Sequence, residues 1–125
     1  MGCDIHGWIE INDDGKWIAF SELKNRNRNY ERFAKLAGVR DYEGNSDVTP
    51  KGVPEDVSET TAFHIKRWDS DGHSHSHLTL TEAAKIFLET EFNASDYAKQ
   101  YPVCHFFNID EEDAENYRLV FWFDN

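Results

Sequence analysis

The segment from Tyr117 to Phe123 constrains the fold most, because it consists almost entirely of aromatic and aliphatic residues. Residues of this kind are enriched in strands that pack on a core. A second strand is predicted over residues 3–12, where isoleucines alternate with His6, Trp8 and Glu10, which is the period of a half-buried strand. The chain must therefore build a sheet, and the turn signal Asp13-Asp14-Gly15 predicts that residues 16–20 return as a hairpin.

Helices are predicted between these strands. Asn29 can cap a helix that runs from Tyr30 to Ala37, and Gly38 supplies its left-handed stop. The next segment, residues 41–54, is rich in Gly, Pro and Asn and is expected to be a long loop, which in a compact domain is usually functional or mobile.

Two further helix starts carry capping signals. Asp56, three residues before Glu59, predicts a helix from about Val57 to Trp68, and Thr79 with Glu82 forms a regular capping box for another. The residues that these two helices are expected to bury are Ala62, Ile65, Trp68, Ala83, Ala84, Phe87 and Leu88.

The rest of the chain completes the prediction. Residues 93–101 are expected to form a short helix, residues 103–109 a strand and residues 111–115 an acidic turn. Runs of strands and helices that do not alternate regularly indicate an α+β fold. We predict one domain over residues 1–125, in which a small antiparallel sheet packs with three to four helices.

The charge balance excludes some partners. A formal net charge of −11 over 125 residues disfavours passive binding to nucleic acid or to an anionic membrane, since both need Lys and Arg against phosphate. The sequence has no signal segment and no apolar run of membrane-spanning length. With only Cys3 and Cys104, we expect reduced thiols in an intracellular protein.

The stretch from Trp68 to Leu80 is the strongest candidate for a site. Its order is Asp69-x-Asp71-x-His73-x-His75-x-His77, with Ser74 and Ser76 between the histidines. In an extended chain, the three histidines would line one side and the serines the other. Such a set can bind Zn, Mn, Fe or Mg, or it can supply a general base, a general acid and phosphate donors without metal. The plainer alternative is a solvated polar loop.

Two other sets of residues add to this candidate. Asp4 and His6 would share one strand face and form a metal arm or an oriented base, unless they are only the polar face of an edge strand. Asp124 at the last strand's end is either an orienter for His or a carboxylate in water. The predicted catalytic residues are His6, Asp71, His73 and His75, and the predicted ligands of a divalent Zn, Mn or Mg ion are Asp4, His6, Asp71 and His73.

A local anion site is predicted near the first helix. Two or three arginines flank that helix, and its N-terminus offers backbone N–H groups to a phosphate. The alternative is a set of surface ion pairs with the many acidic residues. The predicted substrate-binding residues are Arg28, Asn29, Tyr30, Arg40, Ser74 and Ser76, with Arg26 as a further arginine of the cluster.

Several of these segments together resemble a family of small, mostly uncharacterised bacteriophage proteins. The segments that carry the resemblance are Cys3-Asp4-Ile5-His6, Arg28-Asn29-Tyr30, Leu36-Ala37-Gly38-Val39-Arg40, Gly52-Val53-Pro54-Glu55-Asp56-Val57-Ser58, Asp71-Gly72-His73-Ser74-His75-Ser76, Leu78-Thr79-Leu80 and residues 118–125. The resemblance implies a phage setting, and hence the host cytoplasm. Many relatives have an aromatic residue in place of His77, which is therefore left out of the candidate set.

Three functions fit these observations. The first is a small hydrolase, a phosphodiesterase that cleaves a cyclic nucleotide signal of bacterial immunity, by analogy with other small phage proteins. The second is a non-enzymatic protein that sequesters such a nucleotide, for which a homo-oligomer is an open option. The third is an acidic inhibitor that binds a host enzyme. The first requires that His6 and the mid-chain histidines meet in one cleft.

Overall fold

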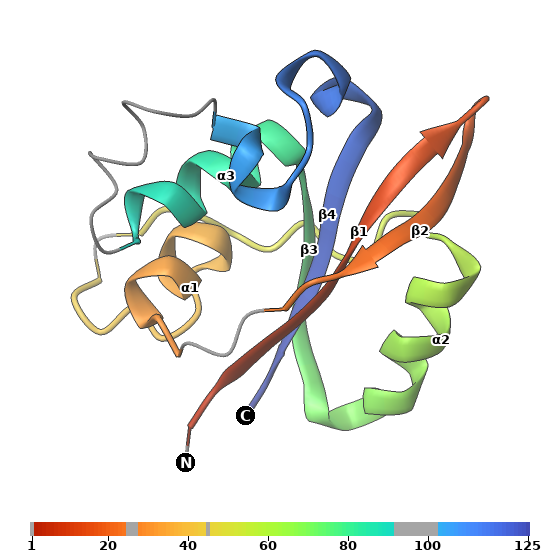
Figure 1. Ribbon diagram of the computed structural model, residues 1–125. Coiled ribbons are helices and arrows are strands. Elements are labelled where there is room, and N and C mark those ends of the chain that lie inside the picture. The colour runs from red at the N-terminus through yellow and green to blue at the C-terminus, as the bar shows by residue number, and fades with distance from the viewer. Residues whose placement is uncertain (1, 25–27, 45, 92–102) are drawn as a thin grey trace.

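A four-stranded antiparallel sheet organises the protein in the computed structural model, which describes residues 2–24, 28–44, 46–91 and 103–125. The strand order is β2-β1-β4-β3, and Figure 1 shows the helices around the sheet. The strands are β1 (Asp4–Asp13), β2 (Lys16–Glu22), β3 (Gly72–Thr79) and β4 (Tyr117–Asp124). The predicted α+β class, with one small antiparallel sheet and a few helices, is confirmed. The sequence had not assigned the histidine stretch to the sheet as β3.

β4 lies in the middle of the sheet because almost every one of its side chains is apolar. It pairs with β1 on one side and with β3 on the other. Residues 119–123 are all buried, so this strand is covered on both faces. That explains why its sequence reads as a continuous apolar run rather than as an alternation.

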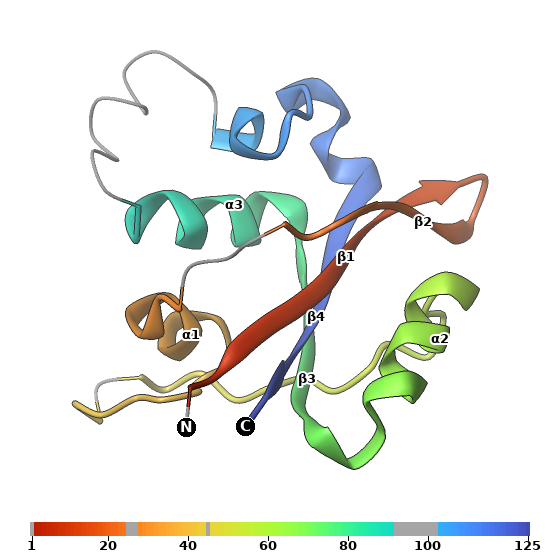
Figure 2. The ribbon, with the colours of Figure 1, turned by 60° about the horizontal axis from the view of Figure 1, so that its bottom comes forward.

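α1 (Tyr30–Ala37) and α3 (Leu80–Glu89) cover one face of the sheet, as Figure 2 shows. Their predicted ends are confirmed. The Asn29 side chain accepts the Arg32 N–H, Gly38 ends α1 with a φ of 69°, and the capping box of Thr79 and Glu82 starts α3. The stripe predicted for α3, residues 83, 84, 87 and 88, is buried.

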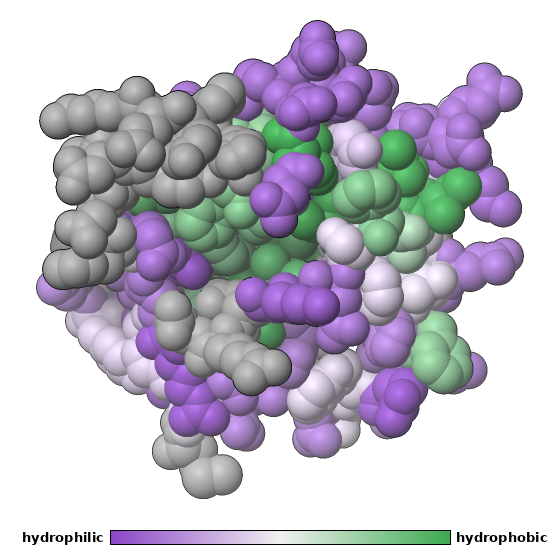
Figure 3. Space-filling view, viewed as in Figure 1, coloured by the Kyte–Doolittle hydropathy of each residue, from purple (hydrophilic) through white to green (hydrophobic). Residues whose placement is uncertain are grey.

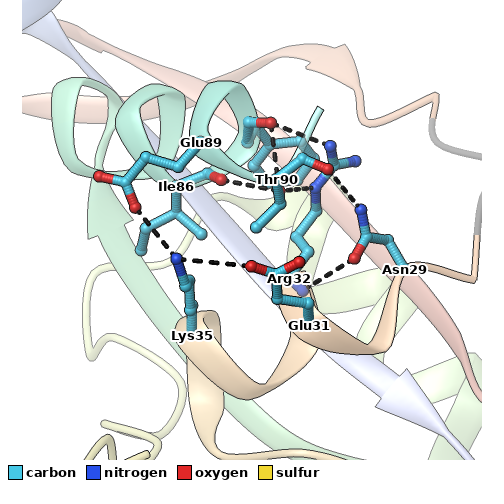
Figure 4. Close-up of polar contacts among 8 residues, drawn as sticks. Asn29, Glu31, Arg32, Lys35, Ile86, Glu89 and Thr90 are labelled. Carbon is cyan, nitrogen blue, oxygen red and sulfur yellow. Dashed lines mark hydrogen bonds and ion pairs between the residues drawn. The ribbon is translucent and has the colours of Figure 1, made fainter. Parts of the chain in front are cut away.

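A buried arginine joins these two helices. Arg32 is 2% exposed. It donates to the carbonyl oxygen of Phe87 at 2.9 Å and to Glu91 Oε2 at 3.0 Å, and it also donates to Thr90 Oγ1. Figure 4 shows Arg32 with Asn29 and Thr90, together with Lys35 between Glu31 and Glu89. α1 is thereby fixed to the C-terminal end of α3 by charged groups as well as by apolar contact.

α2 (Glu59–Trp68) lies alone on the opposite face. Two predictions about it are wrong. The cap is Ser58, whose side chain accepts the Thr61 N–H, rather than Asp56. Thr61 is its fully buried residue, whereas the predicted Ala62, Ile65 and Trp68 are half-buried. Because Asp56 binds Arg118 at 2.8 Å, its carboxylate is not available to cap the helix.

The C-terminal third also departs from the prediction. Val103–Phe107 is a 3-10 helix instead of a strand, and the acidic turn is a 3-10 helix, Glu111–Asn116. The predicted helix over residues 93–101 lies outside the described residues. Within the described ranges, no helix combines the length and the apolar character needed to cross a bilayer.

Part of the face over α3 and the hairpin remains apolar at the surface. Figure 3 shows hydrophobic residues across the middle of this side, bordered by hydrophilic ones. A hollow of about 580 Å³ there is lined in part by Ile9, Leu23 and Phe87. Neighbouring Ile18 and Phe20 on β2 are 41% and 52% exposed.

Candidate functional site

A bulge in β3 decides where the histidines point. The pairing with β4 shifts between His73, which lies opposite Phe123, and Ser76, which lies opposite Phe121. Ser74 has a φ of 55°, which is uncommon for a residue other than glycine. A bulge places two residues opposite one and so breaks the alternation of side chains.

The bulge sends the histidines to different faces. His73 stacks beside Phe123 at 6.3 Å between ring centroids, on the face of α1 and α3. His75 stacks beside Trp122 at 6.3 Å, on the face of α2, and His77 lies opposite Val120 on that same face. The prediction that His73, His75 and His77 share one side is therefore wrong.

His6 lies on the α2 face of β1, which is separated from β3 by β4. It lies opposite Trp122, and Asp4 lies opposite Asp124. His6 Nε2 is 3.2 Å from Asp124 Oδ2, and Asp124 Oδ1 accepts the Asp4 N–H at 3.0 Å. The side chains of His6 and Asp124 are 26% and 15% exposed. A carboxylate held in this way fixes the orientation of the imidazole.

Tryptophans separate and cover the two imidazoles. Trp122 lies on β4 between the strands of His6 and His75, with its ring centroid 6.1 Å and 6.3 Å from theirs. Trp68, at the end of α2, stacks on His6 at 4.1 Å. Trp122 is 1% exposed. His6 and His75 thus share one face, on either side of a buried indole.

Two buried polar atoms in this cluster have no hydrogen-bond partner among the described residues. They are His75 Nε2 and Trp122 Nε1. Burial lowers the pKa of His75 below its ordinary value, and the positive charge of His73 lowers it further. The neutral ring is therefore favoured at His75.

The other predicted catalytic residues lie elsewhere. Asp71 is exposed in the short 3-10 helix Asp69–Asp71. His73 faces the opposite side of the sheet, where its Nδ1 lies 3.0 Å from Ser74 Oγ. Of the four predicted catalytic residues, the structure brings His6 and His75 to the same face. Asp124 orients His6, which is one of the two roles that the sequence analysis considered for this carboxylate.

The predicted metal ligands do not converge. Asp4 accepts two hydrogen bonds from Arg28, at 2.8 Å and 3.2 Å, which lower the pKa of its carboxyl group. His6 and His73 lie on opposite faces of the sheet. In the part of the chain that the structure describes, no group of three His, Cys, Asp or Glu side chains is arranged to hold a metal ion.

Arg28 and Arg40 of the predicted anion site lie at the ends of β1 and β4 and bind groups of the protein itself, and Arg26 lies outside the described residues. Arg28 reaches Asp4, and Arg40 donates to the Asn125 carbonyl oxygen at 3.1 Å while its guanidinium lies 5.3 Å from the Tyr30 ring. Arg28 thereby binds the residue whose N–H donates to Asp124, and Arg40 binds the residue that follows Asp124. Asn29 serves as the cap of α1 and donates to the Thr90 carbonyl oxygen.

The two predicted serines have structural partners. Ser76 is 2% exposed and accepts the Lys51 N–H, which binds the loop before α2 to the edge of β3. Ser74 is engaged with His73. The predicted phosphate contacts from these two hydroxyls are therefore in competition with contacts inside the protein.

Sequence reasoning missed Trp68 and Trp122 as parts of the site. Trp122 is two residues before Asp124, and strand periodicity alone puts both on one face. This signal was available in the sequence. Once Phe121 and Phe123 are assigned to the core face of the strand, Trp122 and Asp124 must lie on the other face. Nothing in the sequence indicated that Trp68 would stack on His6.

Comparison of the chain with protein-family models, with curated proteins and with solved structures gave no match. The geometry described above is therefore the basis for a functional assignment.

Proposed function

We propose that this protein is a small phosphodiesterase-type hydrolase whose acid–base groups are His6 and His75. The observation that carries the proposal is that two imidazoles from different strands flank Trp122 on one sheet face, and that Asp124 orients one of them at 3.2 Å. Two such groups can deliver a proton to a leaving oxygen and remove one from an attacking oxygen.

The surroundings assign the two roles. His75 is the base, because burial favours its neutral ring, and a base must begin without the proton. We assign His6 as the acid, since it is the other imidazole of this face and the Asp124 carboxylate, 3.2 Å away, orients its ring. The strands that carry them are two spacings apart, about 9.6 Å, and the Trp122 ring lies between the two imidazoles.

Substrate must enter past Trp68. Trp122 is buried, and Trp68 lies against His6, so contact with both histidines requires displacement of the Trp68 ring. A nucleobase can replace that ring, since aromatic side chains and bases stack well on one another. Arg28 and Arg40, near the strand ends, supply positive charge for phosphate.

These features favour a nucleotide as the substrate, and the resemblance to phage proteins directs the choice to cyclic nucleotide signals of bacterial immunity. The test is incubation of the protein with a panel of cyclic dinucleotides, with and without EDTA. We expect turnover that His6→Ala and His75→Ala each reduce by about 10²–10⁴-fold.

The matched control is His73→Ala, which removes an imidazole from the opposite face of the same strand and should leave turnover nearly unchanged. Absence of product with every member of the panel, or equal activity in His75→Ala, contradicts the proposal. Loss of activity in EDTA alone would instead assign the chemistry to a metal.

A sequestering protein is the second candidate, favoured by one observation. The rings of Trp68, His6 and Trp122 form a continuous contact, which suits a planar base even without catalysis. Calorimetry that shows tight binding, with the ligand recovered intact, supports this candidate over the hydrolase.

A further inference from the structure

The proposed base lies where the pairing between β3 and β4 is interrupted. The residue pairs of this ladder pass from His73 directly to Ser76 and skip Ser74 and His75. Ser74 has a φ of 55°, which costs free energy in a residue other than glycine. Because a bulge disrupts the ladder locally, the backbone at His75 depends on contacts from its other side.

A short segment outside the sheet supplies those contacts. Gly52 N–H donates to the His75 carbonyl oxygen at 2.8 Å, and Lys51 N–H donates to Ser76 Oγ at 3.0 Å. β3 is an edge strand, so the contact with the His75 backbone lies on the side of β3 away from β4. Figure 2 shows the chain between α1 and α2 crossing close to β3. We call residues 50–54 the strap.

The sequence of the strap limits its freedom. It reads Pro-Lys-Gly-Val-Pro, and each proline fixes its own φ and favours an extended residue before it. Pro54 is buried, and Asp56 just beyond it binds Arg118 at 2.8 Å. Gly52 has a φ of 87°, and among the described residues nothing lies within 4 Å of a Cβ added to it. Glycine therefore serves here for its backbone conformation and not for close packing.

The contact at Ser76 is buried and lies next to the histidine. Ser76 is 2% exposed, and a buried hydrogen bond is costly to lose when no other partner replaces it. The strap thus holds the carbonyl oxygen of His75 and the side chain of the residue that follows it. Since the His75 ring stacks beside Trp122 at 6.3 Å between centroids, a shift of this backbone would move the ring.

We propose that Gly52 and Ser76 are positioning residues for His75, which hold the backbone of the bulge through the strap and so keep the imidazole beside Trp122. Neither contact involves the ring itself. The positioning stands on these contacts, whereas its effect on turnover rests on the proposed hydrolase. There, displacement of the base slows the chemical step, because proton transfer depends on the exact placement of the group.

Nuclear magnetic resonance of the isotopically labelled full chain tests the positioning without any substrate. Ser76→Ala removes the hydroxyl acceptor, and Gly52→Ala puts a side chain on a residue with positive φ. In both variants we expect the amide proton at position 52 to exchange with solvent about tenfold faster. The ring signals of His75 should lose part of the shift that the Trp122 ring causes, while those of His6 on β1 stay in place.

Val53→Ala is the matched control, because it shortens a strap side chain that is 41% exposed and keeps both contacts. It should change neither measurement. Under the proposed hydrolase, Ser76→Ala and Gly52→Ala should lower kcat by about 10–10²-fold with KM nearly unchanged. Unchanged His75 signals in both variants, or equal shifts of His6 and His75, overturn the proposal. If the His75 ring moves but no nucleotide of the panel is cleaved, the positioning stands and the proposed hydrolase fails.

Discussion

The two faces of the sheet are built from different kinds of side chain. Toward α1 and α3, β1 and β4 present apolar residues, and most of the core lies there. Toward α2, the same two strands present His6, Trp8 and Glu10 from β1 and Arg118, Trp122 and Asp124 from β4. Each strand thus divides its sequence between one face that is packed like a core and another that is charged and aromatic.

The difference separates stability from chemistry. The α2 face keeps its charges through specific pairs. Arg118 donates to Glu10 Oε1 at 2.7 Å and lies 4.0 Å from the Trp17 ring centroid. Glu10 Oε2 accepts the Ser58 N–H at 2.9 Å and so holds the start of α2. Pairs of this kind fix geometry more than they add free energy.

The largest effect is expected from removal of a ring on the apolar face. Phe33 is fully buried and packs against Phe123 at 5.1 Å between centroids, so Phe33→Ala should lower the free energy of unfolding by about 3–5 kcal/mol. Urea denaturation measures it. Phe63→Ala on α2, where the side chain is 59% exposed, is the control and should cost about 0.5 kcal/mol or less. Similar losses in the two variants would contradict the division of the faces.

A smaller loss, about 3 kcal/mol, is expected from Arg118→Met, because it leaves the Glu10 carboxylate buried without its cation. The double variant with Glu10→Gln should recover part of this loss, since the amide oxygen can still accept the Ser58 N–H without carrying a charge. Thermal and urea unfolding of the three variants decide the matter. If the double variant is no more stable than Arg118→Met, the buried charge is not the cause.

Histidines on the α2 face should control how stability depends on pH. This applies between neutral pH and the more acidic range in which carboxyl groups titrate. Burial is the first cause that lowers the pKa of both His75 and His77, so the unfolded chain binds protons there more readily. The contribution of these two histidines to the free energy of unfolding is therefore fully present above about pH 6.5. It is lost as pH falls, by at most about 1.4 kcal/mol per pH unit for each histidine.

The double variant His75→Phe, His77→Phe should flatten this slope when urea midpoints are compared at pH 7.5 and 5.5. A slope identical to that of the unaltered protein would show that other groups cause it. The lowered pKa values of Asp4, Asp56 and Glu82 affect stability only at more acidic pH, where these carboxylates become protonated.

The smallest effect is expected at the rim of the α2 face. The side chains of Arg28 and Asp4 are 53% and 43% exposed, so Asp4→Asn should change the free energy of unfolding by about 1 kcal/mol or less. High salt should reduce even that difference, because exposed charges are screened. A loss above about 2 kcal/mol would indicate that this pair also supports the end of the sheet.

The fold could be predicted where one local rule acts alone. The aromatic run of β4, the cap at Asn29, the stop at Gly38 and the capping box at Thr79 each depend on near neighbours in the sequence. The start of α2 could not be predicted, because Asp56 and Ser58 both suit a cap and the choice depends on distant Arg118.

The site could be predicted only in part. That His6 would lie on the same face as a mid-chain histidine was anticipated, but which histidine it would be was not. The bulge at Ser74 breaks the alternation of side chains, so residues before and after it do not share faces as simple periodicity predicts. No turn signal marks the bulge in the sequence. The burial of Trp122 Nε1 and His75 Nε2 without a described partner depends on packing between distant segments, which periodicity does not describe.

His6 and Asp124 lie 118 positions apart in the sequence, on strands that are neighbours in the sheet. A nascent chain on the ribosome cannot form this dyad until translation has passed Asp124 and that strand has been inserted between two others. Folding intermediates that lack the last strand hold His6 without its carboxylate. Any activity that depends on the dyad should consequently arise in a single step, at the end of folding.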